Sequence, residues 1–213
     1  MWRRATRYVD GARRPSGGQR VGRHLRLPLR AAVIAGAVVV VGGLTACGAG
    51  APQVQARTWA GTFCRSFVGY EHAIDGLGAR LDSGLRTTPS TDLTARRQAL
   101  VGYLTAVVTR TDGLSHAVTN GGTPDMPHGS EFVVYVEDGF HQFRQTVAIA
   151  GHRAARLPAR DPVAFSTAIS RITATIQAGS QQSRATIVHA RSRYGTRQLD
   201  HALTGTPACQ AIA

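Results

Sequence analysis

Two pairs of side chains combine a carboxylate with an imidazole at helical spacing, an arrangement that binds metal ions in some helical proteins. They are Asp138 with His141, and His72 with Asp75. Di-metal helical bundles place a Glu on two helices and a Glu-x-x-His motif on the other two, all pointing inward. Here the second and fourth predicted helices offer no inward carboxylate, and Asp138 lies off the apolar stripe of its helix. We therefore expect no metal and no cofactor, and we interpret Glu137 and His141 as an exposed pair one helical turn apart.

No familiar catalytic motif occurs in the sequence. The metalloprotease pattern His-Glu-x-x-His, the nucleophile elbow Gly-x-Ser-x-Gly, the Walker loop and the redox pair Cys-x-x-Cys are all absent. Serine, histidine and aspartate are present, but a catalytic triad is defined by the geometry that joins them. We therefore assign no catalytic residue.

Three cysteines carry the remaining reactive chemistry, and Cys47 stands in a distinctive context. It ends the run Leu-Thr-Ala-Cys at residues 44–47, which closes a segment of sixteen uncharged residues, 31–46, behind an arginine-rich region. A bilayer span needs about twenty residues, so this length favours a signal peptide. The run resembles the lipobox of bacterial lipoproteins, in which the cysteine receives a diacylglycerol and becomes the new amino terminus. The resemblance implies lipidation of Cys47; the alternative is a single-pass anchor with an unmodified cysteine.

The lipobox divides the chain into three predicted parts. Residues 1–46 are the signal peptide, residues 47–57 are the lipidated cysteine with a flexible linker, and residues 58–213 are the exported domain. The expected location is the extracytoplasmic face of the cell membrane, where the membrane itself is the partner of the anchor. Because the arginine-rich region is long for a signal peptide, we expect translation to start near Val21 rather than at Met1.

The positive charge of the chain does not indicate nucleic-acid binding. The net charge is +13, but residues 1–46 alone hold nine arginines and one acidic residue. The rest of the chain holds sixteen arginines and eleven acidic residues, spread along its length. Nucleic-acid-binding proteins cluster their cations on one face, so we expect no nucleic-acid partner. These arginines are interpreted as a solvated surface, with weak attraction to anionic lipid or wall polymer as the alternative.

Four amphipathic helices must position these residues. Apolar side chains recur every three or four positions in four segments, which run over residues 59–85, 93–118, 133–157 and 165–194. Asp92 and Asp161 offer helix N-caps, and Gly195 is a stop signal. Short connections favour antiparallel neighbours. The predicted fold is all-α: an up-down-up-down four-helix bundle with a short C-terminal tail helix, preceded by the lipoprotein signal peptide.

This topology also makes predictions about packing. The fourth helix would end beside the start of the first, which brings Cys64 to the same end as Cys209 in the tail. Both cysteines are in a disulfide-permissive compartment after export, so we expect them to pair; two free buried thiols are the alternative. The tail, residues 199–212, is expected to cover the apolar start of the third helix at this end.

Size matching predicts how the third and fourth helices meet. A turn flanked by Leu157 and Pro162 places Phe140 opposite Gly179. A large ring against a glycine is how protein cores interdigitate. We therefore expect this pair in the contact between the two helices.

Together these features resemble uncharacterised actinobacterial lipoproteins and small secreted proteins. The matching features are the lipobox, Cys64 near Trp59, the phrase Pro-Asp-Met-Pro-His-Gly at residues 124–129, and Pro-Ala-Cys at residues 207–209. The resemblance implies an envelope-anchored helical protein and assigns no activity. We expect a non-catalytic binding or interaction protein, whose partner is an envelope protein or a small molecule. The alternatives are an envelope enzyme with an unrecognised site, which a deep polar cavity would favour, and an accessory subunit of a transport or sensor system.

Overall fold

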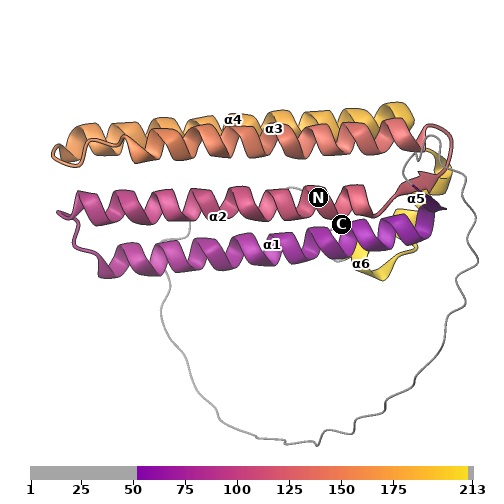
Figure 1. Ribbon diagram of the computed structural model, residues 1–213, viewed down its shortest axis with the longest axis horizontal. Coiled ribbons are helices and arrows are strands. Elements are labelled where there is room, and N and C mark those ends of the chain that lie inside the picture. The colour runs from indigo at the N-terminus through magenta and orange to yellow at the C-terminus, as the bar shows by residue number, and fades with distance from the viewer. Residues whose placement is uncertain (1–51, 211–213) are drawn as a thin grey trace, which may run out of the picture. The chain divides into compact units, whose positions relative to one another are not determined.

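The computed structural model describes residues 52–210, and these residues are mostly helical. Within them, four long helices follow one another along the chain, accompanied by two short helices and two three-residue strands (Figure 1). The elements are β1 (Gln53–Gln55), α1 (Ala56–Thr87), α2 (Leu93–Asn120), β2 (Thr123–Asp125), α3 (Gly129–Ala155), α4 (Pro162–Tyr194), α5 (Arg197–Thr204) and α6 (Pro207–Gln210). The predicted all-α class is confirmed.

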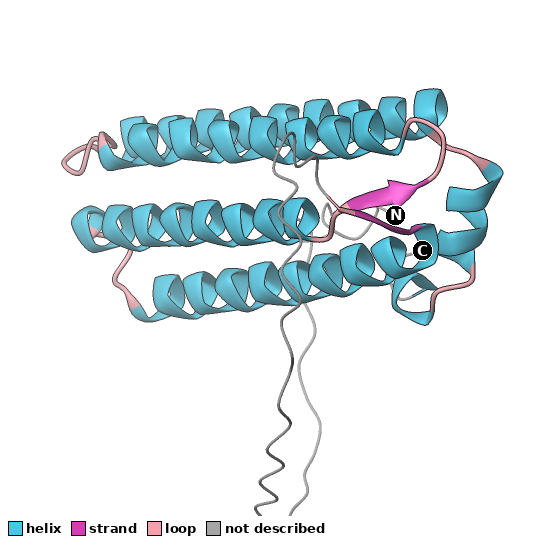
Figure 2. Ribbon diagram, turned by 45° about the vertical axis from the view of Figure 1, so that its right-hand side comes forward, coloured by secondary structure: helices cyan, strands magenta, loops and turns pink. Residues whose placement is uncertain are grey.

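The amino-terminal predictions fall mostly outside this part of the chain. The predicted signal peptide, the lipobox with Cys47 and the predicted start at Val21 lie outside the described residues. The predicted linker, residues 47–57, lies partly within them, and there the prediction is corrected. Residues 53–55 form β1, which pairs in parallel with β2, and α1 begins at Ala56 (Figure 2). Because the two strands pair, the extended backbone of β1 has hydrogen-bond partners in β2, whereas a free linker would find such partners only in water.

Capping side chains set where α2 and α4 begin. An oxygen of Asp92 accepts a hydrogen bond from the backbone N–H of Ala95 at 2.9 Å. Asp161 Oδ1 accepts from the backbone N–H groups of Val163 and Ala164, at 2.9 and 3.0 Å. The first N–H groups of a helix have no partner inside the helix, so these carboxylates satisfy them and stabilise the helix start. Both caps agree with the sequence prediction.

Each long helix packs against the next one along the chain: α1 against α2, α2 against α3, and α3 against α4. α2 and α3 are therefore the central pair, and α1 and α4 are not close neighbours in the described part of the chain. The core joins α2, α3 and α4, and Ile74 and Leu77 of α1 pack against it. Its buried residues are Leu93, Leu104, Val107, Val147, Ala150, Ala154, Leu157, Phe165 and Ile172.

A cluster of aromatic rings covers the start of α3. Trp59 of α1 meets Phe132 edge-on, with 5.5 Å between ring centroids, and Phe63 lies 6.5 Å from Phe140. The tail packs chiefly on α1, where Leu199 of α5 is completely buried. The apolar start of α3 is thus covered by rings of α1 and not, as was predicted, by the tail.

The predicted register between α3 and α4 is wrong. A Cβ built at Gly179 would overlap the side chain of Thr146, six positions along α3 from the expected Phe140. The interlocking of side chains sets the register instead: Thr146 packs against Gly179, and Ile187 of α4 packs against Gly139. The connection also differs from the expected one. Leu157 folds into the core and is only 2% exposed, so it does not flank a tight turn, and residues 156–161 are all needed to reverse the chain.

Candidate binding surface

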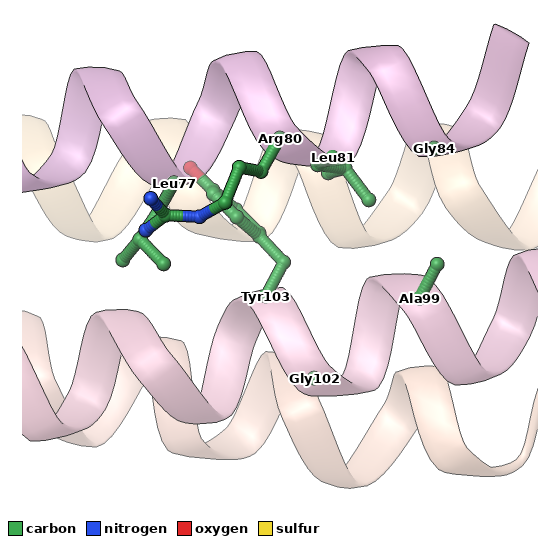
Figure 3. A pocket seen from close by; sticks show the side chains of 7 residues that line it. All are labelled: Leu77, Arg80, Leu81, Gly84, Ala99, Gly102 and Tyr103. Atoms are coloured by element: carbon green, nitrogen blue, oxygen red, sulfur yellow. The ribbon is translucent and has the colours of Figure 1, made fainter.

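α1 and α2 leave a hollow between them near the connection that joins them. Its volume is about 240 Å³. The lining is largely apolar and consists of Leu77, Arg80, Leu81 and Gly84 of α1 with Ala99, Gly102 and Tyr103 of α2 (Figure 3). Leu77, Leu81 and Tyr103 are half-buried, whereas Arg80 and Gly102 are exposed. We call this feature the α1–α2 hollow.

Two glycines keep the α1–α2 hollow open. A Cβ built at Gly84 or at Gly102 would meet no other atom within 4 Å. Among the described glycines only Gly122 has a positive φ, so neither Gly84 nor Gly102 serves an unusual backbone conformation. Glycine inside a helix costs about 1 kcal/mol relative to alanine. Neither the backbone nor the packing of the helices therefore requires a glycine at these two positions.

Sequence reasoning did not identify this hollow. The periodic pattern located Leu77, Leu81 and Leu85 on the apolar face of a helix, but it did not show which of them a neighbouring helix would cover. The available signal was Gly102 in the middle of a helical segment and Gly84 inside the last turn of another, since glycines within helices are unfavourable without a reason.

The net charge of the described residues is concentrated at the end of the molecule that contains the α1–α2 hollow. We define the far end as residues 77–107 and 146–175, which are the two connections shown on the left of Figure 1 with the adjoining parts of α1 to α4. It holds eight arginines and three aspartates, a net charge of +5. The other described residues hold eight arginines and eight acidic residues. The excess positive charge therefore lies entirely at the far end.

The three aspartates of the far end are already engaged. Asp82 pairs with Arg86, while Asp92 and Asp161 cap helices. Seven of the eight far-end arginines therefore have no carboxylate partner among the described residues. Three of these seven donate to neutral oxygens, and four are exposed and make no such bond within residues 52–210: Arg80, Arg156, Arg160 and Arg171.

A disulfide closes the opposite end. Cys64 of α1 and Cys209 of α6 are bonded, with 2.04 Å between the sulfur atoms and 5.0 Å between the Cα atoms. Both side chains are buried. The structure thus brings together the two cysteines that were predicted to pair. We call the end of the molecule that contains Cys64 and Cys209 the disulfide end. Arg57 adds a hydrogen bond to the backbone oxygen of Gly205 at 3.0 Å, which also ties α1 to the tail.

The disulfide end has a more polar hollow. About 380 Å³ in volume, it is lined by side chains of β1, α1, β2 and α5 that include Arg57, Asp125, Gln198 and His201. The amide of Gln198 donates to the backbone oxygen of Asp125 at 2.7 Å. Among the described residues, no serine, threonine or cysteine is hydrogen-bonded to a histidine ring nitrogen, the contact that activates a nucleophile in hydrolases.

A group of polar rings lies where α3 begins and α4 ends. Tyr135 is 5.3 Å from Tyr194 and 6.1 Å from His189, measured between ring centroids. Hydrogen bonds from its own backbone N–H, from Ser130 and from His128 lower the pKa of the Glu131 carboxyl. Desolvation raises the pKa of the Tyr194 phenol. The carboxylate and the phenol both keep their usual charge at neutral pH as a result.

The carboxylate–imidazole pairs singled out in the sequence do not converge. Glu137 accepts a hydrogen bond from Thr119 at 2.6 Å, and His141 Nδ1 lies 3.4 Å from the amide of Gln145. The expected pairing of Glu137 with His141 is therefore corrected: Thr119 on the neighbouring α2 reaches the carboxylate instead. No three histidine, cysteine, aspartate or glutamate side chains within residues 52–210 are grouped closely enough to hold a metal ion.

None of the helices in residues 52–210 has an apolar stretch sufficient to cross a membrane. No protein-family model, curated protein or solved structure matches this chain.

Proposed function

We propose that this protein is a lipid-anchored interaction protein of the cell envelope, akin to the actinobacterial lipoproteins that its sequence resembles. The anchor would be a diacylglycerol on Cys47, at the extracytoplasmic face of the membrane. The support is the order of three features: an arginine-rich region, an uncharged segment at residues 31–46, and the lipobox run at residues 44–47. That order is typical of lipoprotein signal peptides.

The anchor would hold the disulfide end near the membrane. Only four residues, 48–51, lie between Cys47 and Pro52, and four residues span at most about 14 Å even when fully extended. α1 then continues for 32 residues, a length of about 48 Å at the rise of an α-helix. The far end would therefore be the part of the protein most accessible to partners in the envelope.

The finer fold that we propose is an up-down-up-down bundle. Two observations support it: each long helix packs on the one before it, and short connections separate them. α5 and α6 would complete the bundle, since both pack on α1 after the end of α4.

The observation that carries the binding function is the apolar α1–α2 hollow. An apolar depression kept open on a helical surface is typical of a site that receives a side chain of a partner. The glycines at 84 and 102 lie within helices and reduce helix stability, although neither the backbone conformation nor the packing requires a glycine there. A binding role accounts for them, because any side chain at either position would occupy the space.

The anchor is tested by mass spectrometry of the mature protein. We expect the amino-terminal peptide to begin at Cys47 and to carry acyl chains. Cys47→Ala should abolish both the cleavage and the lipid, because the thiol is the acceptor. An intact, unacylated peptide across residues 44–48 in the mature protein would contradict the proposal.

The interaction is tested by site-specific photo-crosslinking in native envelopes. A photoreactive amino acid at Leu81, in the hollow, should give a defined crosslinked product with another protein. The same group at Ala178, exposed on α4, is the matched control and should not give that product. Equal products from both positions, or none from Leu81, would argue against binding at the hollow.

A further inference from the structure

We infer that the α1–α2 hollow binds an acidic peptide segment of another protein, which inserts an apolar side chain into the hollow and presents carboxylates to the far-end arginines. The inference rests on the proposed function as an interaction protein and adds the chemistry of the partner. Two independent properties of the surface carry it: the size and polarity of the hollow, and the net positive charge of the far end, to which the hollow belongs.

The hollow is suited to an anchoring side chain rather than to a free small molecule. Small-molecule sites usually have volumes of roughly 300–1,000 Å³ and bury most of their ligand. The α1–α2 hollow measures about 240 Å³ and is open between two helices. Leu77, Leu81 and Tyr103 supply an apolar wall. A leucine, phenylalanine or similar side chain from a partner would bury this wall, as anchor residues do at the centres of protein interfaces.

The positive charge of the far end indicates the second property of the partner, which is negative charge. Arg80 lines the hollow itself, and its side chain lies beside Leu77 and Tyr103 (Figure 3). Arg156, Arg160 and Arg171 are also exposed at this end and lack a carboxylate within the described residues. Guanidinium groups bind carboxylates through paired hydrogen bonds and are favoured at interfaces. A partner that brings aspartate or glutamate would therefore complete ion pairs that residues 52–210 leave open.

An acidic peptide with an apolar side chain satisfies both requirements at once. A nucleic acid, an anionic wall polymer or an anionic lipid surface would neutralise the arginines but would leave the apolar wall of the hollow without a side chain. A basic or uncharged apolar peptide would fill the hollow but would meet a far end with a net charge of +5. Complementary charge also speeds encounter between partners and rejects partners of the wrong sign.

The glycines permit a variant that blocks the hollow without weakening the fold. In Gly102→Leu the new side chain starts in open space, since a Cβ there meets nothing within 4 Å. Leucine is also a better helix former than glycine. The matched control is Gly69→Leu, because a Cβ at Gly69 also meets nothing within 4 Å and Gly69 lines a different hollow, outside the far end.

The experiment selects random peptides displayed on phage against the protein matured from its full gene and held in phosphatidylcholine nanodiscs. We expect the enriched peptides to combine aspartate or glutamate with at least one large apolar residue. Binding of a selected peptide should weaken by about tenfold or more in Gly102→Leu. It should also weaken in Arg80→Glu and at high salt. Gly69→Leu and Arg184→Glu, which lies outside the far end, should bind as the unaltered protein does.

Three results would overturn the inference: no enrichment of any peptide, enrichment of basic or purely apolar peptides, or selected peptides that bind Gly102→Leu equally well. Two other results would assign the arginines to a polyanion instead, provided that Gly102→Leu leaves the binding unchanged. One is binding of the protein to single-stranded DNA. The other is binding to phosphatidylglycerol-containing vesicles in preference to phosphatidylcholine vesicles. Failure of lipidation at Cys47 would be seen separately by mass spectrometry and would leave the peptide result intact.

Discussion

At the scale of single residues, Tyr70 shows how burial links one side chain to the stability of the fold. Its hydroxyl lies 3.3 Å from the hydroxyl of Thr111, which itself donates to the backbone oxygen of Val107. Burial raises the pKa of Tyr70 to about 12 from an ordinary value of 10.0. The folded protein therefore holds the phenol proton at a pH where the unfolded chain has already lost it.

This shift predicts a loss of stability at high pH. Below pH 10 the phenol is protonated in both states and contributes no pH dependence. Between pH 10 and 12 only the unfolded state releases the proton, so the free energy of unfolding should fall by roughly 2 kcal/mol. Urea unfolding across this range measures the change. Tyr70→Phe should remove most of the slope, and an unchanged slope in that variant would contradict the prediction.

Two glycines of similar helical context should respond in opposite ways to alanine. A Cβ at Gly139 would lie 2.7 Å from Ile187 Cγ1 and 3.2 Å from the backbone oxygen of Ser183, so α3 and α4 must separate. Gly139→Ala should lower the free energy of unfolding by about 1–3 kcal/mol. Gly102→Ala should raise it by up to about 1 kcal/mol, since the new methyl group meets open space. Thermal unfolding measures the effect of each substitution on stability. Equal effects would show that the close contact of α3 with α4 at Gly139 does not exclude a side chain there.

At the scale of elements, the contact between β1 and β2 depends on Gly122. Its φ of +75° is a conformation that side chains rarely adopt, and a Cβ would lie 2.5 Å from the backbone oxygen of Pro52. That same oxygen accepts a hydrogen bond from the backbone N–H of Thr123 at 3.0 Å. Because Gly122 has no side chain, the backbone just before β1 can lie close to the backbone just before β2.

Gly122→Ala should detach β1 while leaving the long helices in place. We expect faster proteolysis around residues 52–55 and faster hydrogen exchange at Thr123, because the backbone bonds there would open. The helical circular dichroism signal should change little. Gly151→Ala is a control within α3, where a Cβ would make an ordinary contact of 3.8 Å with Leu104. Unchanged protection of Thr123 in Gly122→Ala would refute this role of the glycine.

At the scale of the whole molecule, the disulfide joins the two most distant parts of the described chain. Cys64 and Cys209 are 145 positions apart in sequence. A loop of this length corresponds to about 5 kcal/mol in the chain-entropy account of disulfides, as an upper value. The bond also holds α5 and α6 against α1, where Leu199 and Ala202 are buried.

Removing the disulfide should therefore lower the melting temperature by several degrees and release the tail. Cys209→Ser, or reduction of the unaltered protein, should expose residues 197–210 to protease before α1 to α4 are cut, since the tail packs chiefly on α1 and reaches α4 through the exposed ion pair of Arg191 with Asp200. Limited proteolysis followed by mass spectrometry gives the order of cleavage. A tail that stays protected after reduction would mean that its apolar contacts suffice without the covalent bond.

Local patterns determined the helical elements of this protein. Apolar spacing, the capping aspartates at 92 and 161, and the stop at Gly195 place the long helices within a few residues of where they lie. These signals are short-ranged, since a helix is specified by side chains three or four positions apart and by the groups that satisfy its ends. The disulfide was also accessible from sequence, because chain order and helix length bring Cys64 and Cys209 to one end.

Tertiary packing alone decided the relations between elements. The contact of Gly179 with Thr146, the pairing of β1 with β2 and the ring of Trp59 over Phe132 join segments far apart in the chain. Each depends on how side chains of different helices interlock, and no periodicity within one helix encodes that fit. The α1–α2 hollow and the net charge of +5 at the far end belong to the same class. They exist only because folding gathers residues 77–107 and 146–175 at one end of the molecule.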